Sequence, residues 1–261
     1  MSFRRMRHVK AREFQGCDIA YDFSNPANLY DATSGGSLVA ADGAIARAND
    51  VSGGSANLTQ GSDATRRPLR KVAALNGLDV ARFDGSNDMM TAGDVGDMLD
   101  KPVTAIAVYK NTSSLAGVFG KSAAAAAAGR WSIIVESSKD KLLFEANVTG
   151  VTDNSGLTQS TVAQVFLGEA NRAGSSATVV SRRNAGAATY TTLTYNDNGT
   201  SYNTSYSLFV GVYQGSDGVS IYSNSYVNGD IGELAKWSVL MPKGARLRLE
   251  QSRCRKWRIS S

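Results

Sequence analysis

The chain has 261 residues, of which 42% are hydrophobic and 20% charged, with 26 glycines, two cysteines and a net charge of +5. It has no apolar run near the ~20 residues that a membrane helix needs, so we expect no membrane insertion. Two cysteines are too few for a disulfide scaffold or a zinc site. We expect Cys17 and Cys254 to be free thiols, while a disulfide between them stays an open alternative.

The positive charge lies at the two ends of the chain. The cations of the first twelve residues are Arg4, Arg5, Arg7, Lys10 and Arg12, with no acidic residue among them. Residues 243–258 carry a net +6, which leaves −6 on the rest of the chain. Residues 1–16 therefore read as a basic arm. It has no apolar segment typical of a secretory signal. Without interleaved aromatic residues, it fits an acidic protein surface better than nucleic acid.

The first half of the chain shows short strand patterns separated by turn residues. Strands are predicted for residues 17–23, 78–83, 89–91, 103–110, 117–120, 131–136 and 142–146. Residues 24–66 read as an ordered loop that wraps on the body. The run 103–110 is apolar on both faces, which is typical of a strand in the centre of a sandwich. The polar residues 137–140 predict a hairpin between their neighbouring strands.

The second half continues this pattern and ends in a helix. Strands are predicted for residues 162–167, 177–181, 189–195, 206–213 and 231–240. Asn198-Gly199 is a strong hairpin signal, and the six alanines 123–128 read as an exposed loop. After Pro242, the apolar residues Leu247, Cys254 and Trp257 share one helical face. About ten short strands with one terminal helix predict an all-β antiparallel sandwich or jelly roll.

Residues that carry catalysis are sparse in the sequence. His8 is the only histidine, which excludes a Ser-His-Asp or Cys-His arrangement. The six glutamates are at least nine residues apart, so the paired acidic spacing of many sandwich glucanases is missing. A carboxylate pair assembled by folding remains open. We therefore expect a protein that is not an enzyme, and keep a polysaccharide hydrolase or lyase as the less favoured alternative.

Two sequence clusters are candidate binding sites. Asp84, Asn87 and Asp88 offer oxygen ligands for a weak calcium site, although a β-turn stabilised by side-chain hydrogen bonds explains the same residues. No other cofactor is expected. Half of the ten tyrosines fall within 25 residues, at Tyr202, Tyr206, Tyr213, Tyr222 and Tyr226. They are either a glycan-binding surface or cross-strand aromatic pairs that stabilise hairpins.

Three segments resemble the laminin-G-like branch of the concanavalin A-like lectin/glucanase superfamily, as found in structural proteins of tailed bacteriophages. The first comprises YDFSNPANLY (21–30), NDVSGG (49–54) and LTQ (58–60). The second comprises RP (67–68) and LNGLDVARFDGSND (75–88). The third comprises IGELAKW (231–237) and the terminal KW (256–257). Their order and spacing extend the resemblance over about residues 18–258.

The resemblance implies a concanavalin A-like, two-sheet antiparallel jelly roll over residues 17–261, with a short C-terminal helix and the basic arm in front. It also implies a structural subunit of the phage virion: a capsid decoration, a head fibre or a tail-associated adhesion protein. Such a protein assembles in the host cytoplasm. Its partners are other virion proteins, copies of itself and, as a further partner, a host surface glycan. The alternative is a free carbohydrate-binding lectin module.

Overall fold

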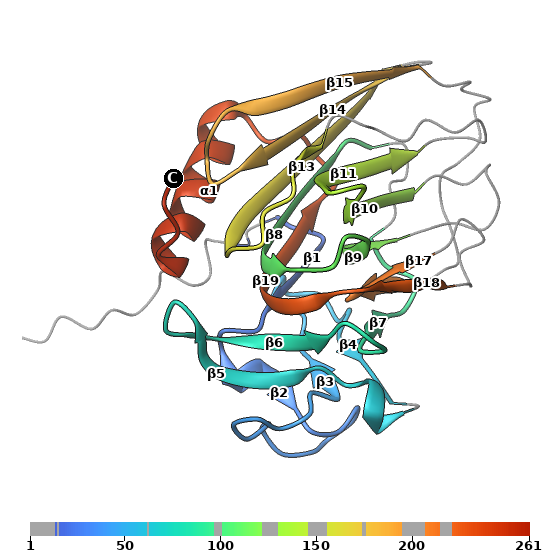
Figure 1. Ribbon diagram of the computed structural model, residues 1–261, viewed down its shortest axis with the longest axis vertical. Coiled ribbons are helices and arrows are strands. Elements are labelled where there is room, and N and C mark those ends of the chain that lie inside the picture. Colours follow the sequence, from blue (N-terminus) through green and yellow to red (C-terminus); the bar gives the residue numbers. More distant parts are fainter. Residues whose placement is uncertain are drawn as a thin grey trace, which may run out of the picture.

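The computed structural model describes residues 14, 16–61, 63–96, 101–121, 130–145, 156–173, 176–194, 207–214 and 221–261. These residues form two large β-sheets, a separate two-stranded hairpin, two short 3₁₀ helices and one α-helix (Figure 1). Every pairing between the described strands is antiparallel. The predicted all-β antiparallel sandwich with a C-terminal helix is therefore confirmed.

We call the sheet beneath the α-helix the helix-side sheet. Its strand order is β15-β14-β13-β8-β19-β6-β5, and β1 also pairs with β19. Its strands are β1 (Ile19–Asp22), β5 (Leu69–Leu75), β6 (Leu78–Asp84), β8 (Val103–Asn111), β13 (Gln164–Ala173), β14 (Ser176–Arg183), β15 (Ala188–Thr194) and β19 (Asn228–Trp237).

We call the other sheet the hairpin-side sheet, with the order β12-β11-β10-β9-β16-β7-β4-β3-β2. Its strands are β2 (Leu29–Tyr30), β3 (Arg47–Ala48), β4 (Leu58–Thr59), β7 (Met90–Ala92), β9 (Ala116–Lys121), β10 (Arg130–Glu136), β11 (Lys139–Glu145), β12 (Leu157–Thr158) and β16 (Leu208–Val210). The remaining elements are the hairpin β17 (Val212–Gln214) and β18 (Ile221–Tyr226), the 3₁₀ helices η2 (Pro26–Asn28) and η3 (Ala64–Arg66), and the helix α1 (Lys243–Trp257).

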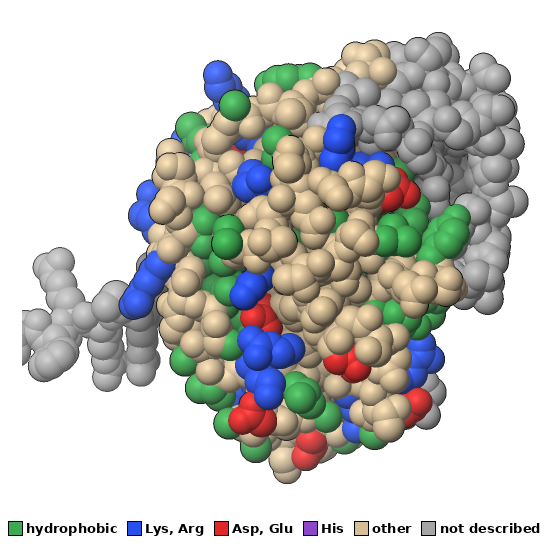
Figure 2. All heavy atoms as spheres, in the orientation of Figure 1, with side chains coloured by type: hydrophobic (Ala, Val, Ile, Leu, Met, Phe, Trp, Pro, Cys, Tyr) green, Lys and Arg blue, Asp and Glu red, His purple; other side chains and the backbone are tan. Residues whose placement is uncertain are grey.

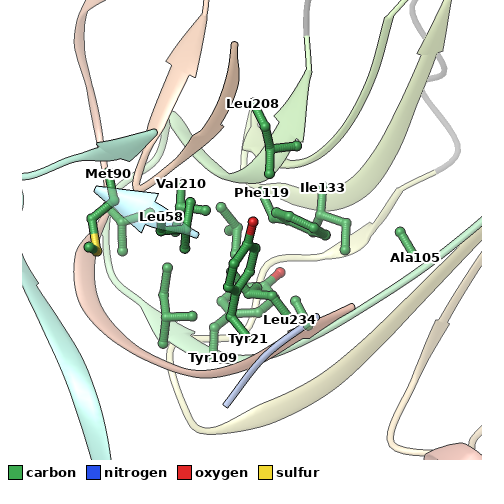
Figure 3. Close-up of a cluster of buried hydrophobic side chains, with 14 of the residues drawn as sticks. Tyr21, Leu58, Met90, Ala105, Tyr109, Phe119, Ile133, Leu208, Val210 and Leu234 are labelled. Atoms are coloured by element: carbon green, nitrogen blue, oxygen red, sulfur yellow. The ribbon is translucent and has the colours of Figure 1, made fainter. Parts of the chain in front are cut away.

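The main core lies between the two sheets. Its aromatic centre is formed by Tyr21, Phe119 and Trp131, whose rings meet edge to face. Phe119 contacts each of its two neighbours in this way, at centroid distances of 6.4 and 5.0 Å. Figure 3 shows Tyr21 and Phe119 among their apolar neighbours. Because side chains alternate along a strand, β8 and β10, for example, send every second residue into this core.

A second apolar cluster lies on the opposite face of the helix-side sheet, under α1 (Figure 1). Ile106 and Val108 of β8 point into it, while their neighbours Ala105 and Ala107 face the main core. The prediction that residues 103–110 are buried on both faces is therefore confirmed. Trp257 of α1 completes the cluster and is fully buried.

Ion pairs fix α1 to the same face. Glu250 of the helix pairs with Arg182 of β14 at 3.0 Å, and Arg246 pairs with Glu169 of β13. Near the end of the helix, Arg253 pairs with Glu233 of β19 at 2.5 Å. Arg246 and Arg253 of the basic C-terminal segment are thus neutralised by carboxylates of the sheet.

The structure corrects the predicted elements in several places. It has nineteen described strands against the ten or so expected, because residues 24–66 contain β2, β3 and β4, and because β5, β12 and β18 were missed. The expected strand 206–213 is divided at Gly211, whose φ of +89° turns the chain out of the sheet. The alanine run 123–128 and the Asn198-Gly199 turn lie outside the described residues. Among the described residues, no helix is long and apolar enough to cross a membrane.

Candidate binding surface

The outer face of the hairpin-side sheet carries a row of side chains that runs across eight strands. Directly paired residues share a face, and the neighbours of these residues point into the core. In strand order the row is Tyr30, Arg47, Thr59, Thr91, Phe209, Gly120, Ser132 and Leu143. The first five are half-buried and the last three buried. One end of the outer face is therefore covered and the other is open.

The covered end lies under the β17–β18 hairpin. Gly117 of β9 makes this possible, because a Cβ there would lie 2.3 Å from the carbonyl oxygen of Val212. Tyr213 packs on Ile134 and Leu143 and keeps only 6% of its surface exposed. The hairpin thus lies directly on the sheet through its first strand.

Tyr222 lies on top of this packed layer. Its ring stacks on the ring of Tyr213, with centroids 5.0 Å apart and an angle of 18° between the planes. Tyr222 keeps 44% of its surface exposed. An aromatic ring held flat by a second ring, with this much surface in contact with solvent, is a preformed stacking platform.

Arginines line the open end of the face. Arg47 lies over the ring of Tyr30 at 4.1 Å and donates hydrogen bonds to the carbonyl oxygens of Thr33 and Gly35, each at 3.1 Å. Arg67 likewise donates from Nε to the carbonyl oxygen of Gln60 at 2.9 Å. Both guanidinium groups are thus held by main-chain acceptors.

Arg66 joins the arginines to the hairpin. It donates to the carbonyl oxygen of Asn87 and, from Nη2, makes a long contact of 3.5 Å with the hydroxyl of Tyr226. None of the three guanidinium groups forms an ion pair with a carboxylate among the described residues. Asp63 is a described anion near two of them: hydrogen bonds from Thr65 lower its pKa, and the charges of Arg66 and Arg67 add to the effect.

The tyrosine cluster predicted from the sequence is placed in part. Tyr213, Tyr222 and Tyr226 come together on the β17–β18 hairpin, while Tyr202 and Tyr206 lie outside the described residues. Tyr213 supports the platform from below, and Tyr222 is its exposed member. The glycan-binding role of this cluster stays a prediction.

Sequence reasoning missed the other residues of this surface, including Arg47 and Phe209. Arg47 and Tyr30 belong to strands of two residues, which are too short to show an alternating pattern. Phe209 did carry a signal, because it alternates with the core residues Leu208 and Val210. That alternation assigns Phe209 to the outer face.

The proposed calcium ligands form a hydrogen-bonded turn after β6. The carboxylate of Asp84 accepts backbone N–H bonds from Ser86, Asn87 and Asp88, at 2.8, 3.1 and 3.3 Å. Asp88 in turn accepts from the backbone N–H of Asp84 at 2.9 Å. These bonds use one oxygen of each carboxylate, Oδ1 of Asp84 and Oδ2 of Asp88, as expected for a turn held by side-chain hydrogen bonds. Within the described part of the chain, no group of three or more His, Cys, Asp or Glu residues could hold a metal ion.

The two carboxyl groups of this turn have opposite pKa shifts. Burial raises the pKa of Asp88 to about 6, and the nearby charge of Asp84 adds to the effect. Burial also acts to raise the pKa of Asp84, but the backbone N–H donors outweigh it and the pKa is lowered. Asp88 is consequently a buried acid that titrates in the mildly acidic range.

The cations of the basic arm, Arg4, Arg5, Arg7, Lys10 and Arg12, lie outside the described residues. The cysteines are described and both are free. Burial raises the pKa of the Cys17 thiol to about 12 and also raises that of Cys254. Neither is therefore a ready nucleophile at neutral pH.

Comparisons with known proteins show the fold. No family model and no curated protein matches the sequence. Among solved structures, a GH54 α-L-arabinofuranosidase soaked with 4-nitrophenyl α-L-arabinofuranoside is similar at a TM-score of 0.60 and 13% identity, over 90% of this chain and 62% of that one. A Trypanosoma rangeli sialidase in complex with 2,3-difluorosialic acid is similar at 0.54 and 8%, over 91% and 33%.

The binding domain of botulinum neurotoxin serotype D is similar at a TM-score of 0.52 and 9% identity, over 92% of this chain and 51% of that one. The chain thus spans less than two thirds of each of these neighbours. It is an all-β sandwich whose fold is similar to that of these proteins. At these identities the likeness shows the fold alone.

These neighbours contradict the prediction that the chain is not an enzyme, because two of them are glycosidases. The prediction relied on missing motifs, and motifs in sequence do not detect carboxylates that folding brings together. Asp22 and Glu233 are an example: they are directly paired across β1 and β19, and both contact Lys256. They are 211 positions apart, so no spacing rule would have found them.

Proposed function

We propose that the chain binds carbohydrate on the outer side of the hairpin-side sheet, where the β17–β18 hairpin carries Tyr222 as the stacking platform. The observation that carries this proposal is the Tyr213–Tyr222 stack, which holds one exposed ring flat on the surface. An aromatic face packs against the apolar C–H side of a sugar ring, and few other exposed side chains offer such a surface.

Polar groups at the open end of the same face suit the hydroxyls of a sugar. Thr59 and Thr91 lie there next to Phe209, and Arg66 links this end to Tyr226 of the hairpin. Binding sites commonly combine an apolar floor with a few oriented polar groups. The lectin-like fold supports the same proposal.

Two variants of one residue test the platform. Tyr222→Ala removes the ring, and we expect it to weaken binding to a glycan that the chain retains by about tenfold or more, the loss typical of a central aromatic contact. Tyr222→Phe keeps the ring and is the matched control, expected to bind within a few-fold of the unchanged chain. Isothermal titration measures both. Equal affinity in all three chains would exclude Tyr222 as the platform.

We further propose that the chain is a virion subunit of a tailed bacteriophage, displayed at the particle surface as an adhesion or decoration protein. The three-segment resemblance supports this role. Many copies on one particle would strengthen a weak glycan contact through multivalency. The basic arm, through the cations of residues 1–12, is proposed to dock on an acidic neighbouring protein.

Mass spectrometry of purified particles that carry this coding sequence tests the virion role. We expect the chain among the particle proteins, in many copies for a capsid position and in few for a tail or fibre position. Deletion of residues 1–12 should leave a folded sandwich that no longer assembles. Absence of the chain from the particle would contradict the virion role, and normal incorporation of the truncated chain would contradict docking through the arm.

A further inference from the structure

The sandwich has four sheet edges, and three of them are protected. β12 and β2, the edges of the hairpin-side sheet, are two residues long. β5 carries Arg70 and Lys71, shifts register before Leu75, and is bridged by Ala44 of a neighbouring loop. Short strands, charges and irregularities are the devices with which proteins prevent unwanted strand pairing at an edge.

The fourth edge, β15, has none of these devices. Its sequence ATYTTLT has no charge, proline or glycine. It pairs with β14 over seven residues without a bulge, from Ser176–Thr194 to Arg182–Ala188. No backbone bond joins its other side to a described residue. β15 runs along the upper border of the molecule, where much of the visible surface is uncharged (Figures 1 and 2).

We propose that β15 pairs with β15 of a second copy of this chain, antiparallel about a two-fold axis. Full overlap of the seven residues places the axis at Thr191 and sets Tyr190 of one copy opposite Thr192 of the other. The partner is a second copy because the strand is self-complementary: it is uncharged, so identical strands bring no like charges together, and aromatic–threonine pairs stabilise neighbouring strands.

The outward side chains fit this pairing. Tyr190 is 67% exposed and Thr192 is also exposed, so both are available on the face that the second copy would extend. Across β14 their partners are Val180 and Thr178, which are uncharged too. One strand pair is smaller than the interface of an obligate dimer, so the dimer forms and dissociates with protein concentration.

A pair of charge variants tests both the edge and its register. In Tyr190→Lys/Thr192→Lys, lysines of the two copies face each other, and dimer affinity falls on the order of tenfold or more because like charges are directly opposite. In Tyr190→Lys/Thr192→Glu, each lysine faces a glutamate of the other copy, and dimerisation is kept. Sedimentation equilibrium over a wide concentration range measures both, against 27.6 kDa for one chain.

The control is Thr161→Lys/Val162→Lys, which adds the same charge at exposed positions away from β15. Val162 is 66% exposed, which matches Tyr190. Far-ultraviolet circular dichroism confirms folding of each chain. If a charge variant fails to fold, Tyr190→Cys/Thr192→Cys is tested in its place. Oxidation of this variant is expected to give a covalent dimer. The proposal would be overturned if the unchanged chain stays monomeric. It would also be overturned if the dimer persists in the double-lysine variant, or if both charge variants lose the dimer.

Discussion

Replacement of Trp257 by alanine tests how far the sandwich depends on its helix. The indole is fully buried between α1 and the helix-side sheet, and it fills the space above Gly232, where a Cβ would lie 2.3 Å from the ring. Truncation of a buried tryptophan costs about 3–5 kcal/mol, against about 5–15 kcal/mol for a typical domain. For a protein of this size we expect the melting temperature to fall by roughly 6–20 °C.

Urea unfolding followed by far-ultraviolet circular dichroism measures this loss without relying on tryptophan fluorescence. Arg255→Ala is the matched control, because Arg255 lies on the same turn of α1 and is exposed. Its expected effect is within about 0.5 kcal/mol. A loss below about 1 kcal/mol for Trp257→Ala would refute the reasoning, since a cost that small is typical of a surface position.

Three further predictions concern buried groups elsewhere. The pKa of Asp88 is raised from 3.8 to about 6. Its protonated form therefore stabilises the fold below about pH 4, and this contribution is lost as the pH rises to about 6. Asp88→Asn should flatten the dependence of the unfolding free energy on pH over this range, measured by urea unfolding, and raise stability at pH 7 by up to ~3 kcal/mol. An unchanged dependence of stability on pH in Asp88→Asn would contradict the raised pKa of Asp88. Gly211→Ala should lower the free energy of unfolding by at least about 1 kcal/mol, because φ is +89° and the new Cβ would lie 2.2 Å from the ring of Phe83. Thermal unfolding measures this loss, and an unaffected melting temperature would exclude the strain. Tyr109→Phe should cost about 1–3 kcal/mol in urea unfolding, because it removes the O–H donor 2.7 Å from buried Asp140; a neutral effect would show that Asp140 does not need this bond.

The long elements were predictable because their patterns are local. β8 is apolar on both faces, because residues 105–109 are all hydrophobic. β10 and β11 are separated by the two-residue turn Ser137-Ser138, within the predicted hairpin. The terminal helix was visible because Cys254 and Trp257 share a face, and both are buried against the sheet.

The binding surface was less predictable because distant segments build it. Arg66 contacts Tyr226 across 160 positions, and Arg47 reaches the surface on a strand of two residues. The split at Gly211 depends on a positive φ that places Val212 on top of the sheet. These features arise from tertiary packing, which short-range periodicity does not record.

Glycan-array binding by the full chain, with and without calcium, tests the central claim most directly. We predict retention of one or more glycans under both conditions, because the proposed platform is the ring of Tyr222, and stacking of a sugar on a ring needs no cation. Silence of the array under both conditions would contradict carbohydrate binding, and binding only with calcium would contradict the aromatic surface as its site.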